Sequence, residues 1–332
     1  MSGDERLDRF MARANAAYYA TQDPFADFTT APEIAQAFGE VLGLWAAVVW
    51  KQLGRPDPVL LAEAGPGRGT LMADALRAAA RAAPTFRTAL RVHLIETSPR
   101  LRLLQAEAVP EAAWHERLED LPPGSLILLA NEFLDALPIR QFVRRGAGWA
   151  ERWIEAGRFA ERPVRALPPD IPPTAPEGAV LEHSEAAHAF IGALAQRLAR
   201  APGAALFLDY GPAESTVGDS LQAIRAGRPA DPLAEPGGTD LTAHVDFAAL
   251  ARAARAAGAA VYGPVPQGVF LTRLGLMQRT DRLARTQPPA KALALIDAAR
   301  RLVEPDRMGR LFKALALTSP GSPAPPGFAE GA

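Results

Sequence analysis

Three glycines interrupt the segment LLAEAGPGRGTL at residues 60–71, where an acid ends an apolar run and a helical pattern begins. A glycine-rich turn between a strand and a helix lets a ligand approach the backbone closely. The third glycine comes one residue too early for a dinucleotide-binding G-x-G-x-x-G loop, and the Glu63 carboxylate would repel a pyrophosphate. That carboxylate suits the ammonium and sulfonium of S-adenosylmethionine (SAM), so we interpret the segment as a SAM loop, with a tight structural turn as the alternative. The predicted cofactor contacts in this loop are Glu63, Gly65, Gly67, Gly69 and Thr70.

Glu96 closes the next apolar run, residues 91–96, and is a further predicted cofactor contact. It lies 27 positions after Gly69, somewhat beyond the roughly 20 expected for a ribose-binding acid. A carboxylate there can accept hydrogen bonds from both hydroxyls of a ribose. The alternative is an acid at a helix N-terminus, where the helix dipole favours negative charge.

Polar side chains also follow the apolar run at residues 125–130, in the segment LLANEFLDALP. We predict Asn131, Glu132 and Asp135 as catalytic residues, because Asn131 can orient a nitrogen nucleophile and the two carboxylates can pair with a cationic acceptor. A protein arginine is such an acceptor, since its guanidinium stays protonated and binds carboxylates bidentately. The alternative is that Asn131 caps a short helix at residues 133–137.

Two further polar segments, DFTTAPEI and GGTDLTAHVDF, are candidates for the substrate side of the site. Thr30 in the first can instead cap the following helix. In the second, His244 is the histidine best placed for acid–base work, and the alternative is a solvated histidine between the local caps Thr242 and Asp246. The predicted substrate contacts are Asp27, Thr30, Glu33, Asp240 and His244.

These side chains need a framework that brings several strand ends together. Continuously apolar runs that alternate with helical patterns predict a parallel sheet covered on both faces, a doubly wound α/β fold. Ligands bind such sheets at the carboxyl ends of the strands, which is where the polar side chains above lie. The expected strands are 59–64, 91–96, 125–130, 204–209, 259–265 and 312–317, and the expected helices are 70–83, 98–107, 184–200, 245–257 and 290–302.

Two segments break this rhythm. Residues 140–180 predict a small antiparallel excursion followed by a proline-rich stretch, and residues 212–240 are rich in Gly, Pro and Asp without periodicity. We expect both to be insertions that select the acceptor. Helices are also expected at residues 4–19 and 33–53. The predicted organisation is an N-terminal helical cap at 1–57, a catalytic domain at 58–318 and a disordered tail at 319–332.

Composition excludes several classes of function. The 332-residue chain has a net charge of −1, so no long-range field attracts nucleic acid or anionic membrane, and no apolar stretch reaches the roughly 18 residues of a spanning helix. The absence of cysteine excludes disulfides and thiolate metal sites. The five histidines are expected on the surface, since even His183 and His188 do not share a helical face, and no metal is expected. The N-terminus carries acids and lacks an apolar stretch, which is not typical of a secretory signal, so the expected location is the cytoplasm.

A series of motifs runs in order along nearly the whole chain. These motifs are YYATQDPFADFTTAPEIAQAFGE, LAEAGPGRGTL, HLIETSPRL, LLANEFLDALPIRQF, LFLDYG, DPLAEPGGTDLTAHVDF, GVFLTRLGL and RMGRLFKALAL. On these motifs the chain resembles the MidA family of SAM-dependent methyltransferases, also called the family of the mitochondrial complex I assembly factor 7.

The resemblance implies a Rossmann-like class I methyltransferase fold, with a seven-stranded sheet whose last strand is antiparallel. It implies SAM as methyl donor and S-adenosylhomocysteine as product. By position, Gly65, Gly67 and Gly69 would line the methionine part of SAM, Glu96 would hold its ribose, and residues 131–135 would lie at the acceptor side. For the mitochondrial members it implies symmetric methylation of a protein arginine during assembly of respiratory complex I, so the expected partner is a protein, with a complex I subunit as candidate.

One departure from the family pattern concerns the acceptor. The family usually has a glycine-containing insert between the DP and DF of its first motif, whereas only Phe25 and Ala26 separate Pro24 from Asp27 here. A shorter loop predicts different closure over the site and leaves the acceptor open. The leading hypothesis is a protein arginine methyltransferase. The alternatives are a SAM-binding assembly factor with little turnover and a small-molecule methyltransferase.

Overall fold

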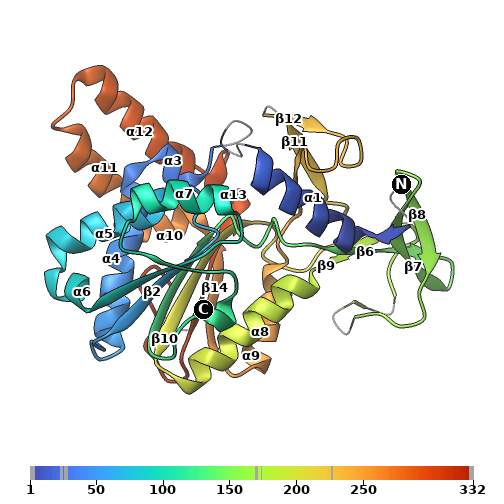
Figure 1. Cartoon of the computed structure of the whole chain (residues 1–332), viewed down its shortest axis with the longest axis horizontal. Helices are drawn as coiled ribbons and strands as arrows, with labels where there is room; N and C mark the ends of the chain where they lie inside the picture. Colours follow the sequence, from blue (N-terminus) through green and yellow to red (C-terminus); the bar gives the residue numbers. More distant parts are fainter. Residues whose placement is uncertain are drawn as a thin grey trace.

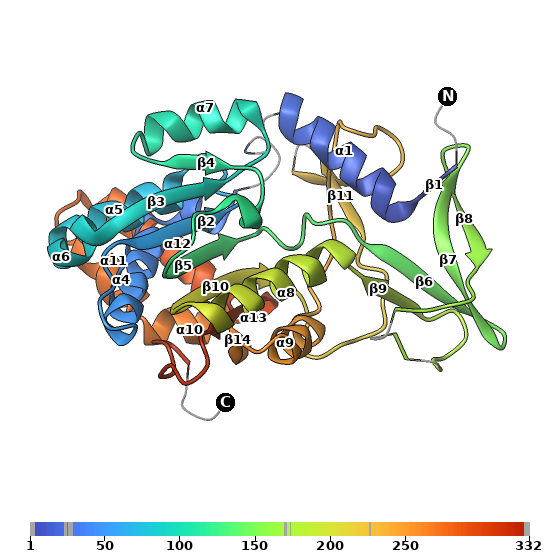
Figure 2. The same ribbon diagram turned by 60° about the horizontal axis from the view of Figure 1, so that its bottom comes forward.

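The centre of the molecule is a seven-stranded sheet in the order β14-β15-β10-β5-β2-β3-β4 (Figures 1 and 2). The computed structural model describes residues 4–22, 25, 29–168, 171–172, 174–225 and 227–328. The strands are β2 (Val59–Ala64), β3 (Leu90–Ile95), β4 (Ala113–His115), β5 (Leu126–Asn131), β10 (Gly203–Tyr210), β14 (Ala260–Pro266) and β15 (Phe312–Thr318).

Strand directions in this sheet are those of the predicted methyltransferase fold. β4, β3, β2, β5 and β10 run parallel to one another. β15 runs antiparallel to both β10 and β14. Ala64 at the end of β2 pairs with Ile95 and Ala130, and Asn131 pairs with Leu208. The carboxyl ends of four parallel strands are therefore aligned, and the predicted doubly wound sheet with an antiparallel last strand is confirmed.

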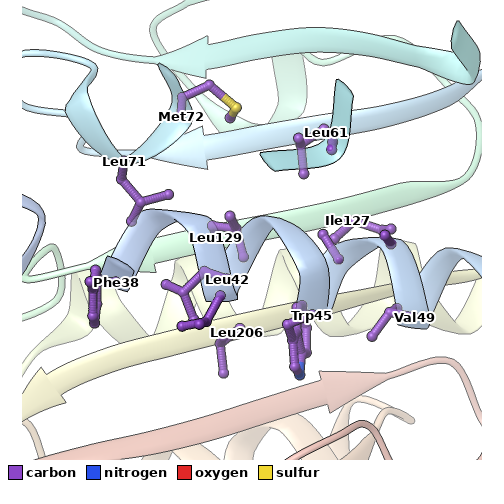
Figure 3. Packing of buried hydrophobic residues seen from close by; sticks show 14 of the residues in the cluster. Phe38, Leu42, Trp45, Val49, Leu61, Leu71, Met72, Ile127, Leu129 and Leu206 are labelled. Atoms are coloured by element: carbon purple, nitrogen blue, oxygen red, sulfur yellow. The ribbon is translucent and has the colours of Figure 1, made fainter. Parts of the chain in front are cut away.

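Side chains alternate between two hydrophobic layers, as the period of a strand requires. Leu61, Ile127 and Leu206 face the layer that includes α4, and Figure 3 shows them against Leu42 and Trp45 of that helix. Their neighbours in sequence, such as Leu128, face the layer that includes α8 and α9. The helices outside the N-terminal region are α4 (Gln36–Gln52), α5 (Thr70–Ala82), α6 (Pro84–Ala89), α7 (Pro99–Ala108), α8 (Glu185–Arg200), α9 (Phe247–Ala256), α10 (Gln267–Arg273), α11 (Leu276–Ala284), α12 (Pro289–Val303) and α13 (Met308–Leu311).

The N-terminal region differs from the prediction in two places. The first helix is α1 (Leu7–Thr21), and the residues before it form a two-residue strand, β1 (Glu5–Arg6). The helix predicted at 33–53 is split into α3 (Ala31–Ile34) and α4 by Ala35, which has an extended backbone (φ −146°, ψ 113°). Ala35 is buried against the core, and no Gly or Pro marks the bend, so the local sequence gives no signal for it.

Both segments that break the alternation form small antiparallel sheets. The excursion predicted within residues 140–180 is β6 (Arg140–Arg145), β7 (Gly148–Glu155), β8 (Arg158–Pro163) and β9 (Val180–His183), joined by β1 at the edge of β7. The segment predicted to be irregular, residues 212–240, instead includes β11 (Gln222–Arg225) and β12 (Arg228–Ala230), which pair with each other, and β11 also pairs with β13 (Asp240–Thr242). These strands are too short to show an alternating pattern.

Residues 319–328 are not disordered, so the predicted disordered tail is wrong for this part. The carbonyl oxygens of Pro326 and Ala324 accept hydrogen bonds from Trp45 and Gln52 of α4, and the Phe328 ring packs against Phe270 of α10. The domain division at residue 57 stays a prediction, although α4 shares the hydrophobic layer of the central sheet. No helix in the described part of the chain is long and apolar enough to cross a membrane.

Two histidine pairs correct the expectation that all histidines lie on the surface. His93 is buried on β3, and its Nδ1 lies 2.9 Å from Nε2 of His115 on the neighbouring β4. His183 ends β9 and His188 lies in the first turns of α8, so their rings stack at 4.5 Å across the strand-to-helix turn. Burial and the proximity of His115 lower the pKa of His93 to about 4. Sequence spacing judged on one helix cannot detect either pair.

Candidate active site

A cavity of about 980 Å³ lies at the carboxyl ends of β2, β3, β5 and β10. α1 and residues from β11 and β13 form the opposite wall, and Figures 1 and 2 both show α1 close to β11. This is the position at which doubly wound sheets bind ligands. The predicted site residues that line the cavity are Thr30, Glu33, Glu63, Gly65, Gly67, Thr70, Glu96, Asn131, Glu132, Asp135 and Asp240.

Three predicted site residues are not among those that line this cavity. Gly69 begins α5 and packs on α7, where an added Cβ would lie 3.3 Å from the Ala108 Cβ. His244 lies behind the cavity wall, where it meets the Tyr210 ring edge-to-face and borders a separate cavity of about 240 Å³. Asp27 lies outside the described residues. Glycine spacing alone did not distinguish a residue that faces the ligand from one that closes the turn.

The glycine loop presents its backbone to the cavity. Gly65 and Gly67 have φ values of +65° and +56°, a conformation that L side chains rarely adopt. A Cβ on Gly67 would lie 3.1 Å from the Phe25 ring, whose face is covered by the Arg68 guanidinium at 4.1 Å. Thr70 donates to Glu33 Oε1 at 2.5 Å, so the start of α5 is tied to α3.

Glu63 is the acid beneath the loop, with a side chain that is 2 % exposed. Its Oε2 is buried and has no hydrogen-bond partner among the described residues. Desolvation raises the pKa of the Glu63 carboxyl to about 8, because the penalty of burying the charged form outweighs its hydrogen bond from the Met72 backbone. An ammonium group beside Glu63 would supply the missing interaction and restore its ionised form.

Glu96 lies at the end of β3 in a fully formed hydrogen-bond network. Its Oε1 accepts from the Ser98 backbone N–H at 2.8 Å, and its Oε2 accepts from Gln105 Nε2 at 3.1 Å. Gln105 Nε2 also donates to the Gly67 carbonyl at 2.8 Å. Ser98 caps α7, so Glu96 lies just before the helix terminus that was the alternative for it. Gln105, a residue not predicted from the sequence, joins this acid to the glycine loop.

The segment after β5 forms a turn and not the capped helix considered as an alternative. Glu132 has a left-handed backbone (φ +51°). Asp209, which ends β10 and is 1 % exposed, accepts the backbone N–H groups of Phe133, Leu134 and Asp135 on its Oδ2 at 2.8–3.3 Å. Asp209 thereby performs the capping that was assigned to Asn131. The predicted strand 204–209 ends at this residue, but its pairing with the turn is a long-range contact.

Asn131, Glu132 and Asp135 all line the cavity. Asn131 Nδ2 donates to Glu132 Oε1 at 3.0 Å, and the Ala31 N–H donates to the same oxygen at 3.1 Å. The Oδ1 atoms of Asn131 and Asp135 are buried and have no partner among the described residues. Leaving buried oxygens without hydrogen bonds costs free energy. These two oxygens are therefore the positions to which a bound methyl acceptor would donate hydrogen bonds.

Four carboxyl groups gather at this end of the cavity, namely those of Glu132, Asp135, Asp209 and Asp240. Burial and the charges of the other three hold the pKa of Asp135 well above its usual range. Burial raises the pKa of Asp209 to about 7 and also raises that of Glu132. Within the described residues, no group of His, Asp and Glu side chains is arranged to hold a metal ion.

Two tyrosines that the sequence did not assign to the site complete the acceptor end. Tyr19 of α1 donates to Asp240 Oδ1 at 2.9 Å. Tyr210 donates to Thr242 at 2.7 Å and accepts from Gln222 at 2.9 Å. Asn15 of α1 donates to the carbonyls of Ala136 and Leu241, so α1 is fixed to both the turn after β5 and β13. Burial raises the pKa values of both tyrosines, so both remain protonated donors.

Known proteins resemble this chain over most of its length. Residues 41–265 match the family described as "Putative S-adenosyl-L-methionine-dependent methyltransferase". One relative is the mitochondrial protein arginine methyltransferase NDUFAF7 homolog of Drosophila melanogaster. It is 34 % identical to this chain, and the match covers 94 % of this chain and 80 % of the relative. Human mitochondrial NDUFAF7, also named a protein arginine methyltransferase, is 32 % identical, and the match covers 94 % of this chain and 79 % of the relative.

A solved structure extends the likeness to three dimensions. A Burkholderia thailandensis crystal structure with bound S-adenosyl-homocysteine has a TM-score of 0.82 and 29 % identity, covering 98 % of this chain and 90 % of its own. SAM dependence and a methyltransferase fold are therefore both confirmed, as expected from the glycine loop and the motif series. This chain belongs to the family of S-adenosyl-L-methionine-dependent methyltransferases.

Proposed function

We propose that this methyltransferase transfers the methyl group to an arginine side chain of a partner protein. The observation that carries the proposal is the acceptor end of the cavity, where buried carboxyl groups gather. Within the described chain, Glu132, Asp135 and Asp209 form no salt bridge with a Lys, Arg or His. Buried acids of this kind favour a cationic ligand. A guanidinium fits them best, because it is planar, protonated and able to bind two carboxylates at once.

The residues that fit SAM are those of the donor end. The Glu63 carboxyl, with its unpartnered oxygen, suits an ammonium; the backbone of Gly65 and Gly67 allows close approach; and Glu96 suits a ribose. Bound there, SAM supplies an electrophilic methyl group on a sulfonium. The chain then has to present a nitrogen nucleophile and exclude water.

The catalytic turn supplies the orientation and the proton acceptor. Glu132 and Asp135 would bind the guanidinium, and Asn131 Oδ1 would accept an N–H and fix the remaining nitrogen. In the transfer, the new N–C bond forms as the S–C bond breaks, and the nitrogen loses one proton. Asp135 is the candidate proton acceptor, because its raised pKa makes its carboxylate a stronger base than an exposed one. Asp209 would act as a positioning residue through the turn amides.

The relatives' names support a protein acceptor, since they are called protein arginine methyltransferases. The motif resemblance makes a subunit of respiratory complex I the candidate partner. Those relatives are named as mitochondrial, whereas location of this chain in the cytoplasm stays a prediction. Mass spectrometry of complex I purified from cells with and without this protein tests the candidate, and arginine methylation that does not depend on the protein would exclude it.

The test of the proposed reaction is transfer of isotope-labelled methyl from SAM to proteins of an extract from cells lacking this chain. Acid hydrolysis and amino-acid analysis should place the label in methylarginine. The Asp135→Asn variant should bind SAM by calorimetry but leave no label, while Glu107→Gln, a change at an exposed acid on α7, should match the wild type. Label confined to small molecules, or to lysine or histidine, would overturn the proposal.

A further inference from the structure

The pair of helices α11 and α12 projects at the edge of the molecule (Figure 1). α12 packs against α3, and α3 carries Pro32 and Glu33 in the cavity wall. α13 follows α12, and its last residue, Leu311, also lines the cavity. The base of this helix pair therefore borders the wall of the cavity.

This surface is positively charged in a chain that is slightly negative. Residues 276–310 contain eight Lys and Arg and four Asp and Glu, a net charge of +4, whereas the whole chain carries −1. Some of these cations are neutralised, such as Arg279 by Glu40 and Arg307 by Asp297. Four exposed cations have no ion-pair partner among the described residues, and these are Arg282, Lys291, Arg301 and Arg310.

The same surface exposes large apolar side chains. Leu293 on α12 is 68 % exposed and Leu311 at the cavity is 48 % exposed. Leu293 and Arg301 lie eight residues apart, so they share one face of α12. Burial raises the pKa of Glu132, and the charge of Arg301 partly opposes this rise, so the base of this surface lies within electrostatic range of the turn after β5. Exposed apolar anchors among cations are typical of a protein-binding surface.

We propose that this surface, formed by Arg282, Lys291, Leu293, Arg301, Arg310 and Leu311, docks an acidic face of the protein whose arginine is methylated. The inference rests on the proposed function and adds the chemistry of the partner. The acidic cavity receives the arginine, and the basic helix pair binds acidic residues that flank it. Because α12 has 15 residues, it extends about 22 Å, so the contact reaches well beyond the peptide that enters the cavity.

The test uses a change at the tip of the pair, far from the reacting groups. In the full-length protein, Lys291→Glu combined with Leu293→Ser should raise the KM for the acceptor protein about tenfold, with kcat and the SAM Kd unchanged. The matched control is Lys51→Glu with Val48→Ser, which makes the same charge change and removes an exposed apolar group on α4, outside both insertions. The control should leave the KM at the wild-type value.

Charge exchange gives the decisive comparison. Once the methylated protein is identified, changing its acidic residues nearest the arginine to lysine should weaken methylation by the wild type and restore it with the Lys291→Glu variant. An unchanged KM for the tip variant, or an equal loss in the α4 control, would overturn docking at α11–α12. Methylarginine formation by the wild type separates that result from failure of the proposed reaction, which would give no methylarginine at all.

Discussion

Glu96 and Asp135 lie at opposite ends of the cavity, and their carboxyl groups differ in hydrogen bonding. At the donor end, Glu96 is held by a backbone N–H and by Gln105, so both of its oxygens are satisfied. At the acceptor end, Asp135 keeps a buried oxygen without a partner among the described residues and lies near three other acids. A carboxylate whose oxygens are hydrogen-bonded is held in place and can accept hydrogen bonds from hydroxyl groups. Crowded carboxyl groups with unpartnered oxygens instead favour the binding of a cation. The ribose side of the donor end is thus built in advance. The acceptor end, like the Glu63 oxygen that has no partner among the described residues, is completed by its ligand.

The largest expected effect comes from neutralising the acceptor end. Asp135→Asn should lower kcat by about 10²–10⁴-fold, because it removes both a guanidinium partner and the proton acceptor. The SAM Kd should stay within a factor of about two, since the donor end is untouched. Single-turnover methylation and calorimetry measure the two quantities. A parallel loss of SAM binding would contradict the separation of the two ends.

A smaller effect is expected at the donor end from Glu63→Gln. Loss of a charge-assisted hydrogen bond to the SAM ammonium should weaken SAM binding about 10–100-fold. The variant protein without ligand should not be less stable, because Glu63 is protonated at neutral pH in any case, given its pKa of about 8. Calorimetric titration with SAM and thermal unfolding without it provide the comparison. Wild-type SAM affinity in this variant would remove Glu63 from the site.

The raised pKa of Glu63 also predicts a pH dependence of SAM binding. Below pH 8 the free protein holds a proton on this carboxyl, and binding an ammonium must release it. The SAM Kd should therefore rise as pH falls from about 7.5 to 6, by up to about tenfold per unit. Glu63→Gln should show no such slope. A wild-type Kd that is flat over this range would contradict the assignment.

The smallest effects separate two glycines of the same loop. Gly69→Ala forces a side chain into a left-handed conformation (φ +82°) and should cost about 1–2 kcal/mol of stability, with little change in the SAM Kd, because Gly69 does not line the cavity. Gly67→Ala adds a similar strain but places its Cβ 3.1 Å from Phe25 in the cavity wall. It should therefore also weaken SAM binding. Equal SAM affinities in the two variants would show that the loop does not discriminate between these positions.

Strand ends were predictable from the sequence, whereas the contacts between them were not. Apolar runs ending in Glu63, Glu96 and Asn131 predict the sheet and the edge at which the site lies, because parallel strands align their carboxyl ends. The role of Asp209 depends on its contact with a turn more than 70 residues earlier in the chain. Tyr19 likewise faces the cavity, and Gln105 reaches Glu96 and the glycine loop, only through tertiary packing of α1 and α7.

Other differences have similarly nonlocal causes. The bend at Ala35 is stabilised by burial and has no helix-breaking residue. The segment 319–328 is rich in Gly and Pro, which predicts disorder, yet its carbonyl groups find donors on α4. His244 has the chemistry of a catalytic residue but lies on the far side of Tyr210. Residue type predicted what each segment could do, and packing determined which side chains reach the cavity.

The most direct test of the acceptor end is proton release on binding of the acceptor. With S-adenosylhomocysteine bound, a peptide that contains the target arginine in its unmethylated form should bind at pH 7 and release protons. The raised pKa values of Asp135 and Asp209 leave protons on these carboxyl groups, and the guanidinium displaces them. Calorimetry in buffers of different ionisation enthalpy measures the number released, which should fall in Asp135→Asn. Binding without proton release, or proton release that Asp135→Asn leaves unchanged, would contradict the claim that these carboxyl groups hold protons until a cation binds.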